Sequence, residues 1–155
     1  LRVAGIRYAD VKGFSYGRRD VTGKGLANAY SQTVGQIFTH EVKPYEIDVL
    51  VAEVGDDAAD DHLYHIQYDG TLHDERRFAA IGGKEDELRE KLKESFEPGF
   101  DLDGAIRYGA GVIESVEERA ISAMDWEAAV LDRTRGRRKF YRLTADDLAA
   151  ARTDG

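Results

Sequence analysis

The sequence predicts an α+β fold in which antiparallel sheet packs against helical layers. Helix and strand patterns follow one another in blocks along the 155 residues: a helix pair, three strands, a second helix pair, two strands and a short last helix. Strands joined by tight turns cannot form an all-parallel sheet. Helices that follow one another in pairs along the chain indicate antiparallel helical layers. This order of elements therefore predicts a sheet covered by helices.

Two helices are expected at the start of the chain. The first covers residues 1–16, residues 17–20 break it, and the second covers residues 22–39, where apolar side chains recur at helical spacing. Thr22 or Asp20 can cap the first amides of the second helix. The stripe expected to face inward on the first helix consists of Leu1, Gly5, Tyr8, Val11 and Ser15.

Three strands are expected next. Pro44 prevents a helix, and residues 45–54 are expected to form a strand. Apolar side chains stand at both odd and even positions of this strand, so both of its faces are expected to be at least partly covered. Burial of both faces hints at a second sheet. An acidic loop follows at residues 55–61. Residues 63–68 and 71–81 read as two more strands. Asp69-Gly70 joins them, a hairpin signal in which both central residues take positive φ.

The second half of the chain begins with another helix pair. Residues 84–96 and residues 102–118 show helical stripes, and Pro98-Gly99 separates them. Asp101 is the expected N-cap of the later helix.

Two strands and a short helix complete the chain. The strands are expected at residues 126–131 and 138–143, around a turn that holds the densest basic cluster of the sequence. A last helix follows Thr144, and Asp147 three positions later resembles a capping box.

Composition excludes several classes of protein. The length suits one domain, residues 1–155. A net charge of −8 disfavours nucleic acid and anionic membrane surfaces as partners. No cysteine is present, so disulfides, thiolate zinc sites and cysteine nucleophiles are excluded, and a reducing cytoplasm fits. No apolar stretch approaches the ~20 residues that span a bilayer. The chain begins at Leu1 inside a helical pattern, so we expect that an upstream part has been removed.

No metal or cofactor is predicted. His62 and His65 are three residues apart on a strand, which places the imidazoles on opposite faces. The acidic loop lacks the glycine and glutamate spacing of a calcium loop. Gly82-Gly83-Lys84 lacks the other residues of a phosphate-binding loop. The basic turn at residues 133–139 is expected to be solvated, with subunit contact as the alternative.

Several short strings stand in a specific order along the chain. They are Tyr16-Gly17-Arg18-Arg19-Asp20-Val21-Thr22-Gly23, Gln36-Ile37-Phe38-Thr39 with Lys43-Pro44-Tyr45, Leu63-Tyr64 before Asp69-Gly70, Ala80-Ile81-Gly82-Gly83, and Leu92 and Phe96 before Leu102 and Ala105. Together they resemble the proteasome α-subunit family over nearly the whole chain. The first string is most similar to the actinobacterial members of that family.

The resemblance implies the αββα four-layer antiparallel sandwich of the N-terminal-nucleophile hydrolases, here without its N-terminal strands and gate helix. It implies a non-catalytic subunit of the proteasome core particle in the cytoplasm. As a homoheptameric outer ring stacked on β subunits, such subunits would control the entry of protein substrates and dock an ATPase activator. Gate and activator-pocket residues would lie upstream, so none is assigned.

The resemblance also implies where subunits meet. The helix at residues 1–16 would pack at the interface between the α and β rings. The candidate interface residues are its large side chains and the mixed charges of the following break, which can pair with a neighbour: Tyr8, Lys12, Phe14, Tyr16, Arg18, Arg19 and Asp20. The alternative is that they are ordinary core aromatics and a helix-capping loop.

Two other functions remain open at this point. A β-type threonine peptidase on the same fold needs an N-terminal threonine whose amine is its own base. Leu1 has no hydroxyl, and Thr22, Thr33 and Thr39 lie on or beside a predicted helix, so no catalytic residue is predicted. An unrelated α/β binding domain would instead be built on a single parallel sheet.

Overall fold

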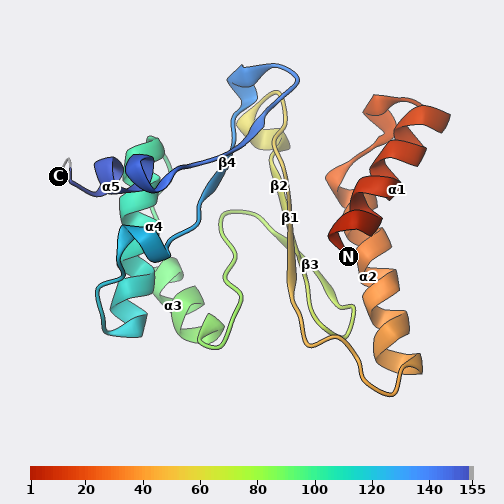
Figure 1. The fold of residues 1–155 in the computed structure, drawn as a ribbon, viewed down its shortest axis with the longest axis horizontal. Helices are drawn as coiled ribbons and strands as arrows, with labels where there is room; N and C mark the ends of the chain where they lie inside the picture. Colours follow the sequence, from red (N-terminus) through yellow and green to blue (C-terminus); the bar gives the residue numbers. More distant parts are fainter. Residues whose placement is uncertain (154–155) are drawn as a thin grey trace. The chain divides into compact units, whose positions relative to one another are not determined.

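Helices and antiparallel strands make up the computed structural model, which describes residues 1–153 (Figure 1). The chain divides into two compact units, an N-terminal unit of Leu1–Ala79 and a C-terminal unit of Ala80–Gly155. The predicted α+β class is confirmed. The four-layer sandwich and the single domain of residues 1–155 stay predictions. Among residues 1–153, no helix combines the length and apolar character that a bilayer span requires.

The N-terminal unit consists of two helices and a three-stranded sheet, as the sequence predicts. The strands run antiparallel in the order β1-β2-β3. The elements are α1 (Arg2–Ser15), a 3-10 turn (Arg18–Asp20), α2 (Gly23–His40), β1 (Val49–Glu53), a 3-10 turn (Ala58–Asp60), β2 (His62–Ile66) and β3 (Leu72–Glu75).

Helix α2 begins at a double cap. The Gly25 amide donates to Thr22 Oγ1 at 3.1 Å, which selects Thr22 over Asp20 as the N-cap. The Gly23 amide donates to Glu53 Oε2 of β1 at 2.9 Å. Because the first amides of a helix have no partner within it, both acceptors stabilise this end and fix α2 to the sheet.

The core of the N-terminal unit lies between α2 and one face of the sheet. Ala27 of α2 packs with Val51, Tyr64 and Ile66, and all four are buried. On the other face of β1, Leu50 is 40% exposed. Leu50 is thus only partly covered and Ala52 on the same face is exposed, because α2 packs on the opposite face of the sheet. The second sheet that the pattern hinted at stays a prediction.

The strands are shorter than predicted, and their partners explain why. Val49 pairs with Ile66, where β2 ends, so residues 45–48 have no strand to pair with. Glu75 pairs with Leu63, next to the start of β2, so residues 76–81 likewise lie outside the ladder. A period-2 pattern shows which residues can form a strand, but the length of the neighbouring strand decides how many do.

The predicted hairpin between β2 and β3 is confirmed, but its turn differs from the prediction. Gly70 has φ +90°, whereas Asp69 does not have a positive φ. The Gly70 amide donates to Gln67 O at 2.9 Å, and the Gln67 amide donates to Thr71 O at 2.9 Å. This is a turn that ends in a left-handed glycine bulge, in which only the last position needs glycine.

The C-terminal unit carries the second helix pair, a two-stranded antiparallel sheet and the last helix, again in the predicted order. Asp101 caps α4, since Asp101 Oδ1 accepts from the Gly104 amide at 2.7 Å. The capping box before α5 is also present: the Asp147 amide donates to Thr144 Oγ1 and the Thr144 amide donates to Asp147 Oδ2. The elements are α3 (Glu85–Ser95), α4 (Leu102–Glu117), a 3-10 turn (Ala123–Asp125), β4 (Ala129–Leu131), a 3-10 turn (Arg133–Arg135), β5 (Phe140–Arg142) and α5 (Ala145–Thr153).

Candidate functional site

Helix α1 packs on α2 through one narrow face. Gly5 is its buried residue, and a Cβ at this position would clash with the Tyr30 ring of α2. The Tyr30 hydroxyl donates to Leu1 O at 3.2 Å. The two helices approach closely here because glycine has no side chain, and this contact decides which side of α1 faces outward.

The outward side of α1 carries exposed apolar side chains among charged ones, since Arg7 and Asp10 lie on the same side and are exposed. Val3 is 78% exposed, Ile6 is 52% exposed and Phe14 is 95% exposed. At 100° per residue, Val3 and Phe14 lie about 160° and about 180° around the helix from Gly5, and Ile6 lies about 100° from it, on the flank of the same side. Single exposed apolar residues are ordinary, but a group of them on one helix face marks a surface that binds another protein. We call Val3, Ile6 and Phe14 the outward face.

Two of the predicted interface residues point inward instead. Lys12 Nζ donates to the Tyr8 hydroxyl at 3.3 Å and lies 5.6 Å from the centre of the Tyr8 ring. A Cβ at Gly25 of α2 would lie 3.0 Å from the Tyr8 hydroxyl, so Tyr8 reaches α2. Tyr8 and Lys12 thus contribute to the packing of the helix pair.

The other predicted interface residues are exposed. Phe14 and Tyr16 are 95% and 80% exposed, and Arg18, Arg19 and Asp20 are exposed in the 3-10 turn that follows α1. Within residues 1–153, the side chains of Arg18, Arg19 and Asp20 form no ion pair. These five residues are placed where a neighbouring subunit could reach them, and their role as an interface stays a prediction.

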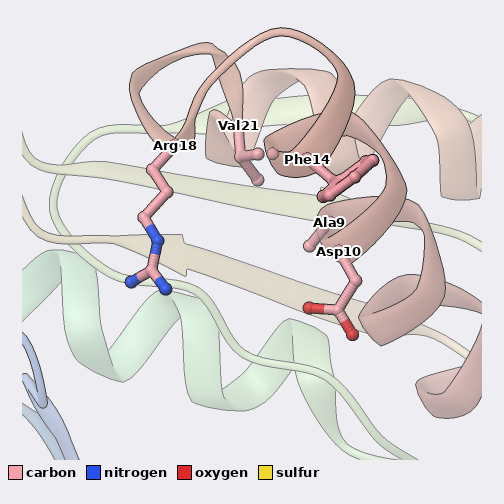
Figure 2. Close-up of a pocket in the computed structure, with 6 residues that line it drawn as sticks. Ala9, Asp10, Phe14, Arg18 and Val21 are labelled. Atoms are coloured by element: carbon pink, nitrogen blue, oxygen red, sulfur yellow. The ribbon is translucent and has the colours of Figure 1, made fainter.

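An open hollow of about 520 Å³ lies beside Phe14 (Figure 2). Figure 2 shows Arg18 on one side of the hollow and Asp10 on the other, with the apolar side chain of Val21 between them. The wall of the hollow is therefore apolar between a positive side chain on one side and a negative side chain on the other. Its lining residues are Ala9, Asp10, Gly13, Phe14, Arg18 and Val21.

Sequence reasoning missed Val3, Ile6 and Asp10. The expected inward stripe ended with Val11 and Ser15, but Val11 is 58% exposed and Ser15 is exposed, so that part of the stripe is wrong. Helix α1 has apolar residues on two sides, and the helical period alone does not tell which side packs inward. The signal that could have decided it is Gly5, whose missing side chain favours close approach to another helix.

The two histidines do not form a metal site with each other. His62 is exposed and stacks on Tyr64 with ring centres 5.9 Å apart. His65 is fully buried, and its Nε2 lies 2.8 Å from Asp48 Oδ2. Since Asp48 Oδ1 also accepts from the Tyr68 amide at 3.1 Å, Asp48 joins the segment before β1 to β2 and its turn.

The hydroxyls that could have been nucleophiles are engaged in helix structure. Thr22 caps α2, Thr33 Oγ1 donates to Ala29 O at 2.9 Å, and Thr39 Oγ1 donates to Gly35 O at 3.0 Å. Each of these hydroxyls serves the backbone of its own helix, and none lies on a strand.

The chain matches known proteins along nearly its whole length. A family model described as "Proteasome subunit" matches residues 5–131. A relative named "Proteasome subunit alpha" from Thermomonospora curvata is 47% identical over 156 residues, which cover 100% of this chain and 68% of the relative. Relatives with the same name from Nocardioides sp. and Kineococcus radiotolerans are 51% and 48% identical and cover 92% and 96% of this chain.

The same alignments cover 58% of the Nocardioides relative and 66% of the Kineococcus relative, so the chain spans about two thirds of the length of the curated relatives it matches. These relatives come from actinobacteria, which confirms the resemblance drawn from the short strings of the sequence. The chain belongs to the proteasome subunit family and, within that family, to the α type.

Proposed function

We propose that this chain is a non-catalytic subunit of the outer ring of a proteasome core particle in the cytoplasm. The observation that carries the proposal is its identity of 47% with a named α subunit over the whole of this chain. In this role seven-fold rings of identical subunits stack on rings of β subunits, form the entry gate for protein substrates and dock an ATPase activator.

Two structural features support the non-catalytic role. Thr22, Thr33 and Thr39 bind helix backbone, whereas a nucleophilic threonine of this fold needs its own free amine beside the hydroxyl. The exposed surface of α1 instead offers contact area without converging acid, base or nucleophile.

The four-layer sandwich belongs to the same proposal. Leu50 is 40% exposed and Ala52 is exposed on the sheet face away from α2. In the C-terminal unit, α4, β4 and α5 line an open hollow of about 280 Å³ with Ile113, Trp126 and Leu148 on its walls. A sheet face and a helix stripe of this kind are stable when a further layer covers them, which the sandwich would supply.

The proposed docking surface for a β-type subunit is the outward face of α1 together with the hollow beside Phe14. Phe14 is the proposed anchor, because a large aromatic side chain that is free in the isolated subunit gains most when a partner buries it. Val3 and Ile6 extend the apolar contact along the helix, while the charges at the hollow set its orientation.

Co-expression of the full-length subunit with the β-type subunit of the same organism tests this function. We expect the wild type to form a large particle and Phe14→Asp to lose most of it. Val42→Asp is the matched control, because Val42 is 104% exposed outside α1. A wild type that never associates with the β-type subunit would overturn the proposed function. Equal assembly of Phe14→Asp and Val42→Asp would exclude Phe14 as the anchor.

A further inference from the structure

We propose that the segment of the β-type partner that enters the hollow beside Phe14 places a basic side chain against Asp10, an acidic side chain against Arg18 and an apolar side chain between them. The inference rests on the proposed function and deepens it, because it names the chemistry of the partner segment. It also makes Asp10 and Arg18 the residues that decide in which direction that segment lies.

Both charged side chains of the hollow lack an ion-pair partner within the part of the chain that the structure describes. Asp10 and Arg18 are exposed, and Figure 2 shows them on opposite sides of the hollow, so they do not pair with each other. A docked partner removes water from both charges, and this cost is offset where the partner supplies the opposite charge. The partner segment therefore carries a base at the Asp10 end and an acid at the Arg18 end.

The wall between the two charges is apolar. Figure 2 shows Val21 between Asp10 and Arg18, and a Cβ added at Gly13 would lie 3.4 Å from Val21 Cγ2, so helix α1 approaches Val21 closely. Ala9 and Gly13, the small residues of α1 that line the hollow, offer no side-chain donor or acceptor. Because a polar group buried without a hydrogen bond costs free energy, the partner side chain that meets Val21 is apolar.

The two ends of the hollow differ, which gives the contact a direction. Figure 2 shows Phe14 on the same side as Asp10, and the Phe14 side chain is 95% exposed. A partner side chain at this end lies beside both a carboxylate and an aromatic ring, which together favour a cation. A segment placed in the reverse direction would bring its acid to Asp10 and its base to Arg18, and like charges in contact oppose binding. The hollow therefore accepts the segment in one direction.

Phe14 and the two charges have separate effects on docking. Exposed ion pairs add little to affinity, so the attraction comes from burial of the Phe14 ring. Charges at such a contact act on the rate of association and on the orientation of the partner. Reversal of Asp10 or Arg18 is therefore expected to slow docking at low salt and to matter less at high salt, where the charges are screened.

Association kinetics of the full-length subunit with the β-type subunit of the same organism test the role of the charges. Asp10→Arg and Arg18→Asp are each expected to dock roughly tenfold more slowly than the wild type at low salt. The double variant Asp10→Arg/Arg18→Asp is expected to stay slow, because the charges of the partner are unchanged. Glu94→Arg on α3 and Lys24→Asp on α2 are the controls, since they make the same changes of charge at exposed positions.

A photo-reactive label at each end of the hollow identifies the chemistry of the partner directly. Residues 1–155 contain no cysteine, so Asp10→Cys and Arg18→Cys each place one thiol in this part of the subunit for labelling with a benzophenone. We expect the label at position 10 to attach beside a lysine or arginine of the β-type subunit, and the label at position 18 to attach beside an aspartate or glutamate. Reversing that base in the partner is expected to restore the docking rate of Asp10→Arg.

The outcomes separate this inference from the proposed function. Charge reversals that dock at the rate of the controls, labels that attach to segments without those charges, or a partner reversal that restores nothing would each overturn the inference and leave the proposed function in place. A wild type that does not associate with the β-type subunit at all overturns the proposed function, and this inference with it.

Discussion

At the scale of single residues, a few side chains that cap helix ends fix where the helices of this chain begin. Thr22, Asp101 and the pair Thr144 and Asp147 each bind an amide that the helix itself leaves without a partner. Asp101 and the Thr144–Asp147 capping box were predicted, and Thr22 was one of two candidates with Asp20, because a capping residue acts within three residues of its own position. Local chemistry of this kind is what a sequence shows most directly.

Asp101→Ala is expected to destabilise the C-terminal unit by about 1 kcal/mol, since the Gly104 amide loses its acceptor at the start of α4. Asp103→Ala is the matched control, because Asp103 lies in the same first turn without capping the helix. Urea denaturation of the full-length subunit measures the difference. Equal losses in both variants would show that charge near the helix end, and not the cap, stabilises α4.

Glu114 shows what the sequence does not reveal. Its Oε1 accepts from the Ile121 amide at 2.7 Å and from Arg152 Nη2 at 2.5 Å. These hydrogen bonds hold the pKa of the Glu114 carboxyl below its ordinary value, with the Ile121 amide as the larger cause and Arg152 as the smaller one. Arg152 is 38 residues away along the chain, so no local pattern could have linked it to Glu114.

The lowered pKa of Glu114 predicts how stability depends on pH. A carboxyl whose folded-state pKa is depressed stabilises fully above its unfolded-state pKa and loses this effect as the pH falls through the folded-state pKa. Glu114→Gln is therefore expected to be less stable than the wild type at neutral pH, with a gap that narrows on acidification. Urea midpoints across the acidic range measure it, and a gap that stays constant with pH would contradict the assignment.

At the scale of elements, the order of helices and strands could be predicted, but their packing faces and exact lengths could not. Residues 1–16 show apolar side chains on two sides, and only the contact of Gly5 with Tyr30 decides that Val3, Ile6 and Phe14 face outward. The strand predicted at residues 45–54 shortens to β1 because β2 ends at Ile66. Both outcomes depend on a neighbouring element, which periodicity does not include.

The contact between α1 and α2 is expected to fail in Gly5→Ala. Alanine favours helix over glycine by about 1 kcal/mol, so a stabilising effect is expected where space is open. At Gly5 the added methyl meets the Tyr30 ring, and the net effect is destabilising. Gly111→Ala in α4 is the control, because nothing lies within 4 Å of its added Cβ. Thermal melting compares the two, and a stabilised Gly5→Ala would contradict the contact.

At the scale of the whole molecule, the N-terminal unit leaves apolar surface that a separate subunit can cover. The outward face of α1, the hollow beside Phe14 and the open side of β1 all belong to this unit. Surfaces of this kind are typical of subunits whose folding is completed by assembly. We propose the kind of assembly from family membership, and we propose α1 as the element through which it forms.

Native mass spectrometry of the full-length subunit, co-expressed with its β-type partner, tests the central claim most directly. The account predicts a particle that contains both kinds of subunit for the wild type and for the control Val42→Asp, and free β-type subunits for Phe14→Asp. A wild type that remains unassociated, or a Phe14→Asp variant that assembles as fully as the control, would contradict it.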